Sequence, residues 1–266
     1  MIKHFFPLQL ALAFLAGTLW NFFSVAFGLK FSSKLAVFMG GLPSTAFLSL
    51  FFIGLTQTPD VVATVTTIFP LSIAISGIFM VVFAMTMRQG FMAAFVSALL
   101  SGVILSLIVI MFTLRRFSLN MMILFVVFIV VYVMLEYLLK VRSVHVEKSR
   151  YPEKHVVMRS LFGGLAVMMT LVIEKRGGAE WAGVFAAFPA MSIAMLALTY
   201  RAHGAEFARW MTKSLMLTSM ITMAVYAIVF KILYIRAGLW VGTFLALSLS
   251  AISVYLIYRF IMPKLK

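Results

Sequence analysis

The chain has 266 residues, of which 64% are hydrophobic and only 11% are charged. Soluble domains average about 45–50% apolar and about 25% charged residues, so this composition excludes a water-soluble globular protein. The chain contains no cysteine, which excludes disulfides, thiol nucleophiles, iron–sulfur clusters and thiolate zinc sites.

Basic residues outnumber acidic residues by 22 to 7, which gives a formal net charge of +15. In a soluble protein this excess would indicate a nucleic-acid partner. Here the basic residues lie between apolar stretches, so we expect no nucleic acid. We interpret them instead as signals of membrane orientation and as contacts for anionic lipid headgroups.

Nine apolar stretches follow one another along the chain, each bounded by charged residues or helix breakers. They cover residues 3–30, 34–60, 60–88, 90–114, 117–139, 157–173, 180–200, 207–230 and 238–258. Because a membrane span needs about 20 apolar residues, the pattern predicts an all-α polytopic membrane protein with about nine transmembrane helices. The long polar segment 140–156 separates the first five helices from the last four.

The distribution of basic residues predicts the orientation of the chain. If the helices alternate in direction, one face of the membrane receives seven basic residues and the other fourteen, with Lys213 counted on neither. The positive-inside rule places the fourteen in the cytoplasm, so we expect a cell-membrane protein with its N-terminus outside and its C-terminus inside. Six of the fourteen lie in or beside the polar linker, and without them the count is eight to seven. Each half by itself therefore has almost no preferred orientation, and we expect the linker to meet anionic headgroups.

An internal repeat relates the two ends of the chain. With a shift of 146 residues the informative pairs are Pro43 with Pro189, Asp60 with Glu206 and, after a two-residue slip, Arg88 with Arg236. The repeat predicts two four-helix units, residues 1–116 and 157–266, joined by a fifth helix and the basic linker over residues 117–156. Equivalent helices are five crossings apart, so the units are inverted in the membrane, as in many secondary transporters.

The second unit carries a short motif: Phe188-Pro189, then Gly204-Ala205-Glu206-Phe207-Ala208-Arg209, and then a final helix that begins after Arg236. This pattern resembles the GlpM/YdgC family of small four-helix bacterial inner-membrane proteins. The likeness covers about residues 157–262, and the first unit has no Gly-x-Glu-x-x-Arg. The resemblance implies a dual-topology family, duplicated here within one chain. The family name is associated with alginate production, which implies envelope or lipid-linked chemistry.

The two repeated prolines mark the first candidate site. A proline within a transmembrane helix frees a backbone carbonyl, which neighbouring helices or a water-filled cavity must satisfy. Interrupted helices at equivalent places in inverted halves point to a binding site near the membrane midplane. The predicted substrate-binding residues there are Pro43, Ser44, Thr45, Pro189 and Ser192. The alternative is that the prolines only kink their helices and the small residues allow close packing.

Four polar residues form the second set of candidates, for coupling or gating. Asp60 and Glu206 each follow a turn, where an acid stabilises the start of a helix. They are either interfacial helix caps or proton- or cation-coupling groups at opposite mouths of a pathway. His203, which is either a surface-loop residue or a proton relay, lies beside Glu206, and Arg209 is one turn further on.

Two further charges lie within predicted helices. Lys213 is six residues into the eighth helix, and we expect it to extend toward the membrane surface beside Arg209. The alternative is that Lys213 faces inward and attracts an anionic substrate. Glu136 ends the fifth helix, where Lys140 at i+4 is the expected partner.

These features predict a transporter or channel-like permease with its substrate site between the inverted halves. The substrate would be a small solute, an ion or a lipid. The alternatives are a flippase for a lipid-linked envelope precursor and a membrane scaffold that transports nothing. The chain shows no phosphate-binding loop, no HExxH and no catalytic triad, so we expect no enzyme activity, no cofactor and no metal site.

Overall fold

A computed structural model describes residues 5–31, 42–112, 114–141 and 153–261. In this part of the chain the elements are α1 (Phe6–Phe31), α3 (Ser44–Thr56), α4 (Pro59–Thr86), the 3₁₀ turn η1 (Met87–Gln89), α5 (Phe91–Phe112), α6 (Phe117–Val133), the π turn η2 (Met134–Leu138), α7 (Glu153–Gly177), α8 (Ala179–Phe185), α9 (Ala190–Leu256) and the π turn η3 (Ile257–Ile261). Within these ranges six helical stretches are long and apolar enough to cross a membrane. The chain is therefore an all-α, membrane-embedded protein.

Helix α9 consists of three arms, because two glycines break its direction. Gly204 and Gly238 have φ of 80° and 79° with ψ near 180°, so they separate residues 190–203, 205–237 and 239–256. This backbone region is open essentially only to glycine. Gly90 before α5 and Gly178 before α8 adopt the same conformation. Four helical segments thus begin directly after a glycine that turns the chain.

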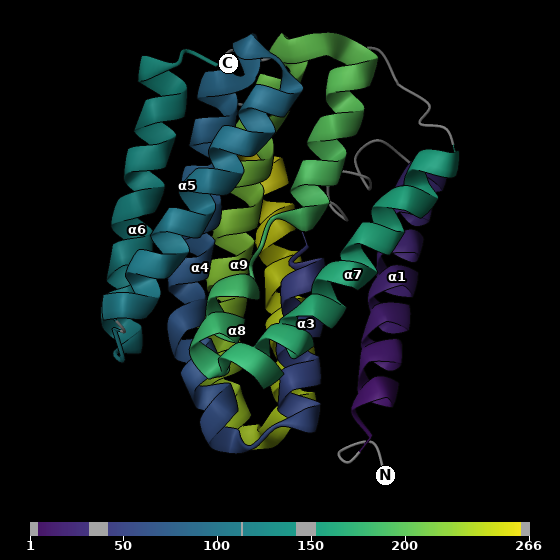
Figure 1. The fold of residues 1–266 in the computed structure, drawn as a ribbon, viewed down its shortest axis with the longest axis vertical. Coiled ribbons are helices and arrows are strands. Elements are labelled where there is room, and N and C mark those ends of the chain that lie inside the picture. Colours follow the sequence, from purple (N-terminus) through teal and green to yellow (C-terminus); the bar gives the residue numbers. More distant parts are fainter. Residues whose placement is uncertain (1–4, 32–41, 113, 142–152, 262–266) are drawn as a thin grey trace.

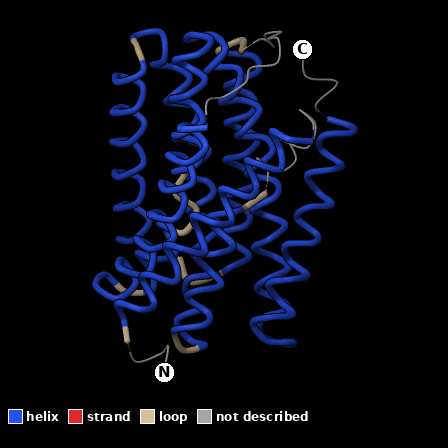
Figure 2. The backbone as a smooth tube through the Cα atoms, turned by 90° about the vertical axis from the view of Figure 1, so that its right-hand side faces the viewer, coloured by secondary structure: helices blue, strands red, loops and turns tan. Residues whose placement is uncertain are grey.

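The two predicted helices that contain the repeated prolines are shorter than expected. The stretch 34–60 is helical from Ser44, directly after Pro43, and residues 32–41 lie outside the described residues. The stretch 180–200 is two helices, because α8 ends at Phe185 and α9 begins after Pro189. The prolines therefore start helices and do not kink them, as expected for a residue without a backbone donor. The break between α8 and α9 lies midway along the bundle (Figures 1 and 2).

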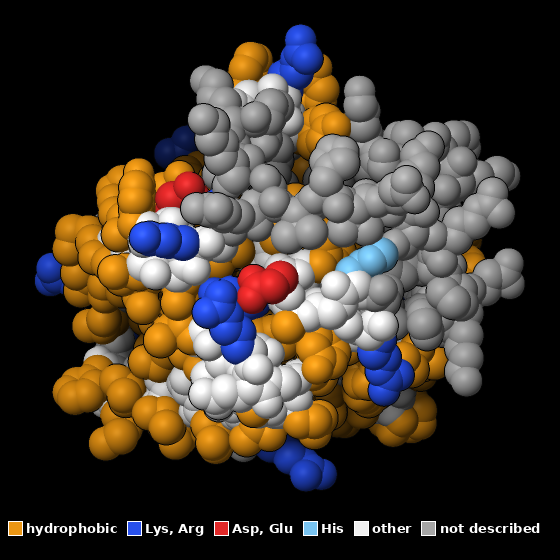
Figure 3. Space-filling view, turned by 90° about the horizontal axis from the view of Figure 1, so that it is seen from above, with side chains coloured by type: hydrophobic (Ala, Val, Ile, Leu, Met, Phe, Trp, Pro, Cys, Tyr) orange, Lys and Arg blue, Asp and Glu red, His pale blue; other side chains and the backbone are white. Residues whose placement is uncertain are grey.

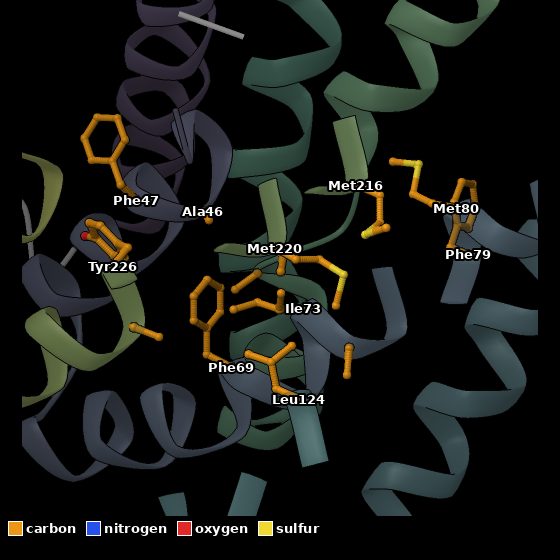
Figure 4. Packing of buried hydrophobic residues seen from close by; sticks show 14 of the residues in the cluster. Ala46, Phe47, Phe69, Ile73, Phe79, Met80, Leu124, Met216, Met220 and Tyr226 are labelled. Atoms are coloured by element: carbon orange, nitrogen blue, oxygen red, sulfur yellow. The ribbon is translucent and has the colours of Figure 1, made fainter. Parts of the chain in front are cut away.

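Helix α4 is the centre of the bundle. Its membrane window is 72% buried, compared with 6% for α5, and α4 contacts α5, α6, α8 and α9. The long middle arm of α9 runs antiparallel to α4, and Gly77 of α4 provides the space that Met220 fills. Figure 4 shows Met220 directed toward Ile73 of α4. This close antiparallel pair defines two ends, one where α4 begins and one where it ends.

Helices α1 and α7 form a second antiparallel pair at the side of the bundle (Figure 1). A methyl group on Gly17 would lie 2.8 Å from the Cα of Gly164, so the two backbones touch through glycine. At the start of α1 the ammonium of Lys175 lies 4.1 Å from the centre of the Phe6 ring.

Candidate functional site

The end of the molecule where α4 terminates carries a cluster of five charged residues, here called the charged cluster: Arg88, Glu136, Glu206, Arg209 and Lys213. Its most connected member is Arg209, which is 3% exposed. Arg209 Nη1 donates to both carboxylate oxygens of Glu206 at 3.1 and 2.9 Å, and its Nε donates to the carbonyl of Ala84 at 3.0 Å. On the surface Arg88 Nε donates to the same carboxylate at 3.2 Å. Figure 3 views the molecule from this end, with acidic side chains lying against basic ones.

Lys213 lies deeper in the bundle than Arg209, and it faces inward. Its side chain is 3% exposed, its Nζ lies 2.5 Å from Glu136 Oε2 and it donates to the carbonyl of Val141 at 3.1 Å. The expected extension toward the membrane surface is therefore wrong. A carboxylate and a free carbonyl are available inside the bundle, and they satisfy the ammonium without contact with water.

The end of α6 explains why these partners are available. The helix widens into the π turn η2, and Lys140 then adopts a positive φ of 46°. The chain turns back over the bundle, where the carbonyl of Leu139 accepts from Arg209 Nη2 at 3.3 Å and that of Val141 accepts from Lys213. Lys140 itself is exposed, so the expected pair between Glu136 and Lys140 is replaced by the pair with Lys213.

Between the two ends, α4 holds the break that follows α8. The hydroxyl of Ser72 donates to the carbonyl of Val184 and accepts from the backbone N–H of Ala187 at 3.1 Å. One turn later, Ser76 donates to the carbonyl of Ala187 at 2.5 Å. Side chains of α4 thus satisfy the peptide groups that the break leaves without helical partners. This attachment fixes α8 to the centre of the bundle.

The opposite end, where α4 begins, contains a pocket of about 280 Å³. Its described lining residues are Ala63, Thr64, Thr67 and Ile68 of α4, Arg115 of the turn before α6 and Glu180 of α8. The four α4 residues form one face of the helix because they repeat at i, i+1, i+4 and i+5. The pocket therefore lies against one face of α4, beside the start of α8 and the turn before α6, and two of its lining residues, Ala63 and Arg115, are exposed. It lies along α4 roughly 25 Å from the carbonyl of Ala84.

A half-buried lysine, Lys231, lies at the edge of this pocket. Lys231 Nζ donates to the hydroxyl of Thr67 at 2.8 Å and reaches the carbonyl of Ala63 at 3.5 Å. It also lies 5.2 Å from the centre of the Phe117 ring. Asn120 of α6 donates to the carbonyl of Thr67 at 2.7 Å, and this bond joins α6 to α4 beside the pocket. From the sequence, Lys231 counts only among the seven basic residues of one membrane face.

The structure brings only some of the predicted site residues together. Glu206 and Arg209 bind one another, Lys213 lies one turn below them, and half-buried His203 packs its ring against Phe207 at 4.7 Å. Asp60 is exposed in the first turn of α4, at the other end of the helix. Pro43 and Thr45 are buried, whereas Ser44, Pro189 and Ser192 are half-buried.

The pocket is formed by residues other than those predicted. None of the ten predicted site residues is among its described lining residues. The signal that could have found it is the presence of two opposite charges, Arg115 and Glu180, beside helix starts at the same face of the membrane. Among the described residues no group of three or more histidine, aspartate and glutamate side chains is placed to hold a metal ion.

No protein-family model, no curated protein and no solved structure matches this chain. Its class, an all-α integral membrane protein, therefore rests on the sequence and the fold.

Proposed function

We propose that this protein is a channel-like permease or secondary transporter of the cell membrane, built from two inverted units. The observation that carries the proposal is the pocket beside α4, which is lined in part by Glu180 of α8, the short helix that ends before the break at residues 186–189. Broken helices that border a cavity are the usual construction of substrate sites in such proteins. The substrate path would run from the pocket along α4 toward the charged cluster.

The order of the helices supports the inverted repeat. With the shift of 146 residues, α1 corresponds to α7, α3 to residues 190–203 and α4 to residues 205–237. With the two-residue slip, α5 corresponds to residues 239–256, and Gly90 to Gly238, both with positive φ. The matching pairs α1 with α7 and α4 with residues 205–237 are antiparallel, as an axis in the membrane plane requires.

The difference between the two ends supports a gated path. The charged cluster closes one end with ion pairs and carbonyl contacts, whereas the other end contains the pocket. Rocking of one unit against the other would open the cluster and close the pocket. By the positive-inside rule the pocket faces the outside and the charged cluster the cytoplasm. The basic linker that supplies most of this bias includes residues 142–152, which lie outside the described residues.

The absence of native cysteine makes a direct test possible, because any introduced cysteine is the only thiol. The variants Thr64→Cys, in the pocket, and Arg116→Cys, at the same end but outside it, are reconstituted in proteoliposomes. Uptake of labelled glycine, acetate, methylamine and chloride is measured before and after a bulky membrane-impermeant thiol reagent. We expect uptake of at least one solute, with both cysteines labelled from the same side and only the Thr64→Cys variant blocked.

Two results would contradict the permease. Liposomes that take up none of the four solutes above the protein-free level would favour a scaffold, and scrambling of a labelled phospholipid in the same liposomes would favour lipid transport. Equal inhibition of the two cysteine variants would show that the pocket is not on the path.

A further inference from the structure

We propose that the pocket at the start of α4 binds a small zwitterion, a molecule that carries a carboxylate and an ammonium group, as amino acids do. This inference rests on the proposed function, because it assigns the substrate class of the same pathway. It depends on the charges that line the pocket, on the setting of Lys231 and on the size of the space.

The pocket contains side chains of opposite charge that do not neutralise one another. Arg115 and Glu180 both line it, yet no ion pair joins them, and neither takes part in any ion pair between described residues. In the charged cluster, by contrast, every carboxylate meets a cation within 3.2 Å. Opposite charges that face one space without contact favour a ligand that carries both charges and bridges them.

Lys231 adds positive charge on the α4 side of the pocket. Thr67 donates its hydroxyl hydrogen to the carbonyl of Ala63 at 2.7 Å, so its oxygen is free to accept from Lys231 Nζ. Among the described residues the partners of this ammonium are this hydroxyl, the Ala63 carbonyl and the Phe117 ring, and all three are neutral. A half-buried cation with only neutral partners favours an incoming carboxylate. The carboxylate of the ligand would therefore lie toward Arg115 and Lys231, and its ammonium toward Glu180.

The size of the pocket matches a small molecule. A water molecule occupies about 30 Å³ in the liquid, so a pocket of about 280 Å³ holds roughly nine waters. A solute of about that many non-hydrogen atoms would fill it. Ala63 and Ile68 supply an apolar wall, whereas Thr64 offers a hydroxyl. The lining suits a short aliphatic part between two charged groups.

The test is equilibrium binding to the purified full-length protein in detergent. The probes are tritiated glycine, alanine and leucine, with unlabelled 4-methylpentanoate and 3-methylbutylamine as competitors that each lack one charged group of leucine. We expect saturable binding of at least one amino acid and at least tenfold weaker competition by both single-charge analogues. Glu180→Gln and Arg115→Gln should each weaken amino-acid binding at least tenfold.

Matched controls lie at the same end of the molecule. Arg116→Gln and Arg176→Gln remove exposed charges outside the pocket, and each should change the affinity less than twofold. The proposal is overturned if no amino acid binds saturably, if 4-methylpentanoate competes as well as leucine, or if the control variants lose as much affinity as the pocket variants. Binding without uptake in proteoliposomes would support the pocket assignment and overturn the permease, whereas uptake of chloride without amino-acid binding would do the reverse.

Discussion

The two ends of α4 place basic residues of the same helical arm in opposite settings. Near the end of α4, Arg209 and Lys213 are buried, and each meets a carboxylate. Near its start, Lys231 meets only neutral groups among the described residues. A cation that is paired with a carboxylate of the protein attracts an anionic ligand only weakly. A cation whose partners are all neutral keeps its charge available for a ligand. Burial of a cation in a membrane protein therefore does not by itself identify a substrate site. The charge of the groups around the cation determines whether it can bind a ligand.

The largest expected difference in stability is between variants of Glu136, in the charged cluster, and Glu180, in the pocket. Glu136→Gln leaves the Lys213 ammonium buried with one carbonyl, so we expect the free energy of unfolding to fall by about 3 kcal/mol. Glu180→Gln breaks no ion pair and should change it by less than about 0.5 kcal/mol. Unfolding in mixed detergent–dodecyl sulfate micelles measures both. Equal values for the two variants would remove the distinction between the ends.

A smaller difference in stability is expected between variants of Arg209 and Arg88, which both bind Glu206. Arg209→Leu removes the bonds to Glu206, Ala84 and Leu139 inside the bundle, and we expect a loss of about 2 kcal/mol. Arg88 is 69% exposed, so Arg88→Leu should cost at most about 1 kcal/mol. Unfolding in the same mixed micelles measures both variants. A larger loss for Arg88→Leu would show that the exposed ion pair, and not the buried one, holds this end together.

Ser72→Ala tests whether α4 holds the break between α8 and α9. Ser72→Ala leaves the carbonyl of Val184 and the buried N–H of Ala187 without their partner, so we expect a loss of about 1.5 kcal/mol. The control is Ser106→Ala, since Ser106 bonds only within α5, to Gly102, and its removal should have almost no effect. If both alanines are neutral, α4 does not hold the break.

The lysine beside the pocket should contribute little to stability. Lys231→Met should change the free energy of unfolding by less than about 1 kcal/mol, because the substitution leaves no charge unpaired and the Thr67 hydroxyl still donates to the carbonyl of Ala63. Lys213→Met should lower it by about 3 kcal/mol, because it leaves Glu136 inside the bundle without its cation. A loss at Lys231 as large as that at Lys213 would show that both lysines are structural.

Sequence patterns located most of the helices but not their inner faces. The apolar stretches predict α1, α4, α5 and α6 to within a few residues, since charged residues and glycines bound them. Interruptions at Pro43 and Pro189 are expected from the sequence because proline has no backbone N–H donor, and a helix indeed begins directly after each of them. Helix faces could not be assigned, because a helix that is apolar on all sides in lipid gives no periodic signal of its buried side.

The sequence by itself determined that this chain lies in a membrane and which charged residues and glycines bound most of its helices. The tertiary structure decided that Glu136 pairs with Lys213 and not with Lys140, that Ser72 holds α8, and that Arg115 and Glu180 share a pocket. The physical reason is distance along the chain. Charge and hydropathy act between neighbours in sequence, whereas these contacts join residues from 65 to 112 positions apart, whose meeting depends on how the helices pack.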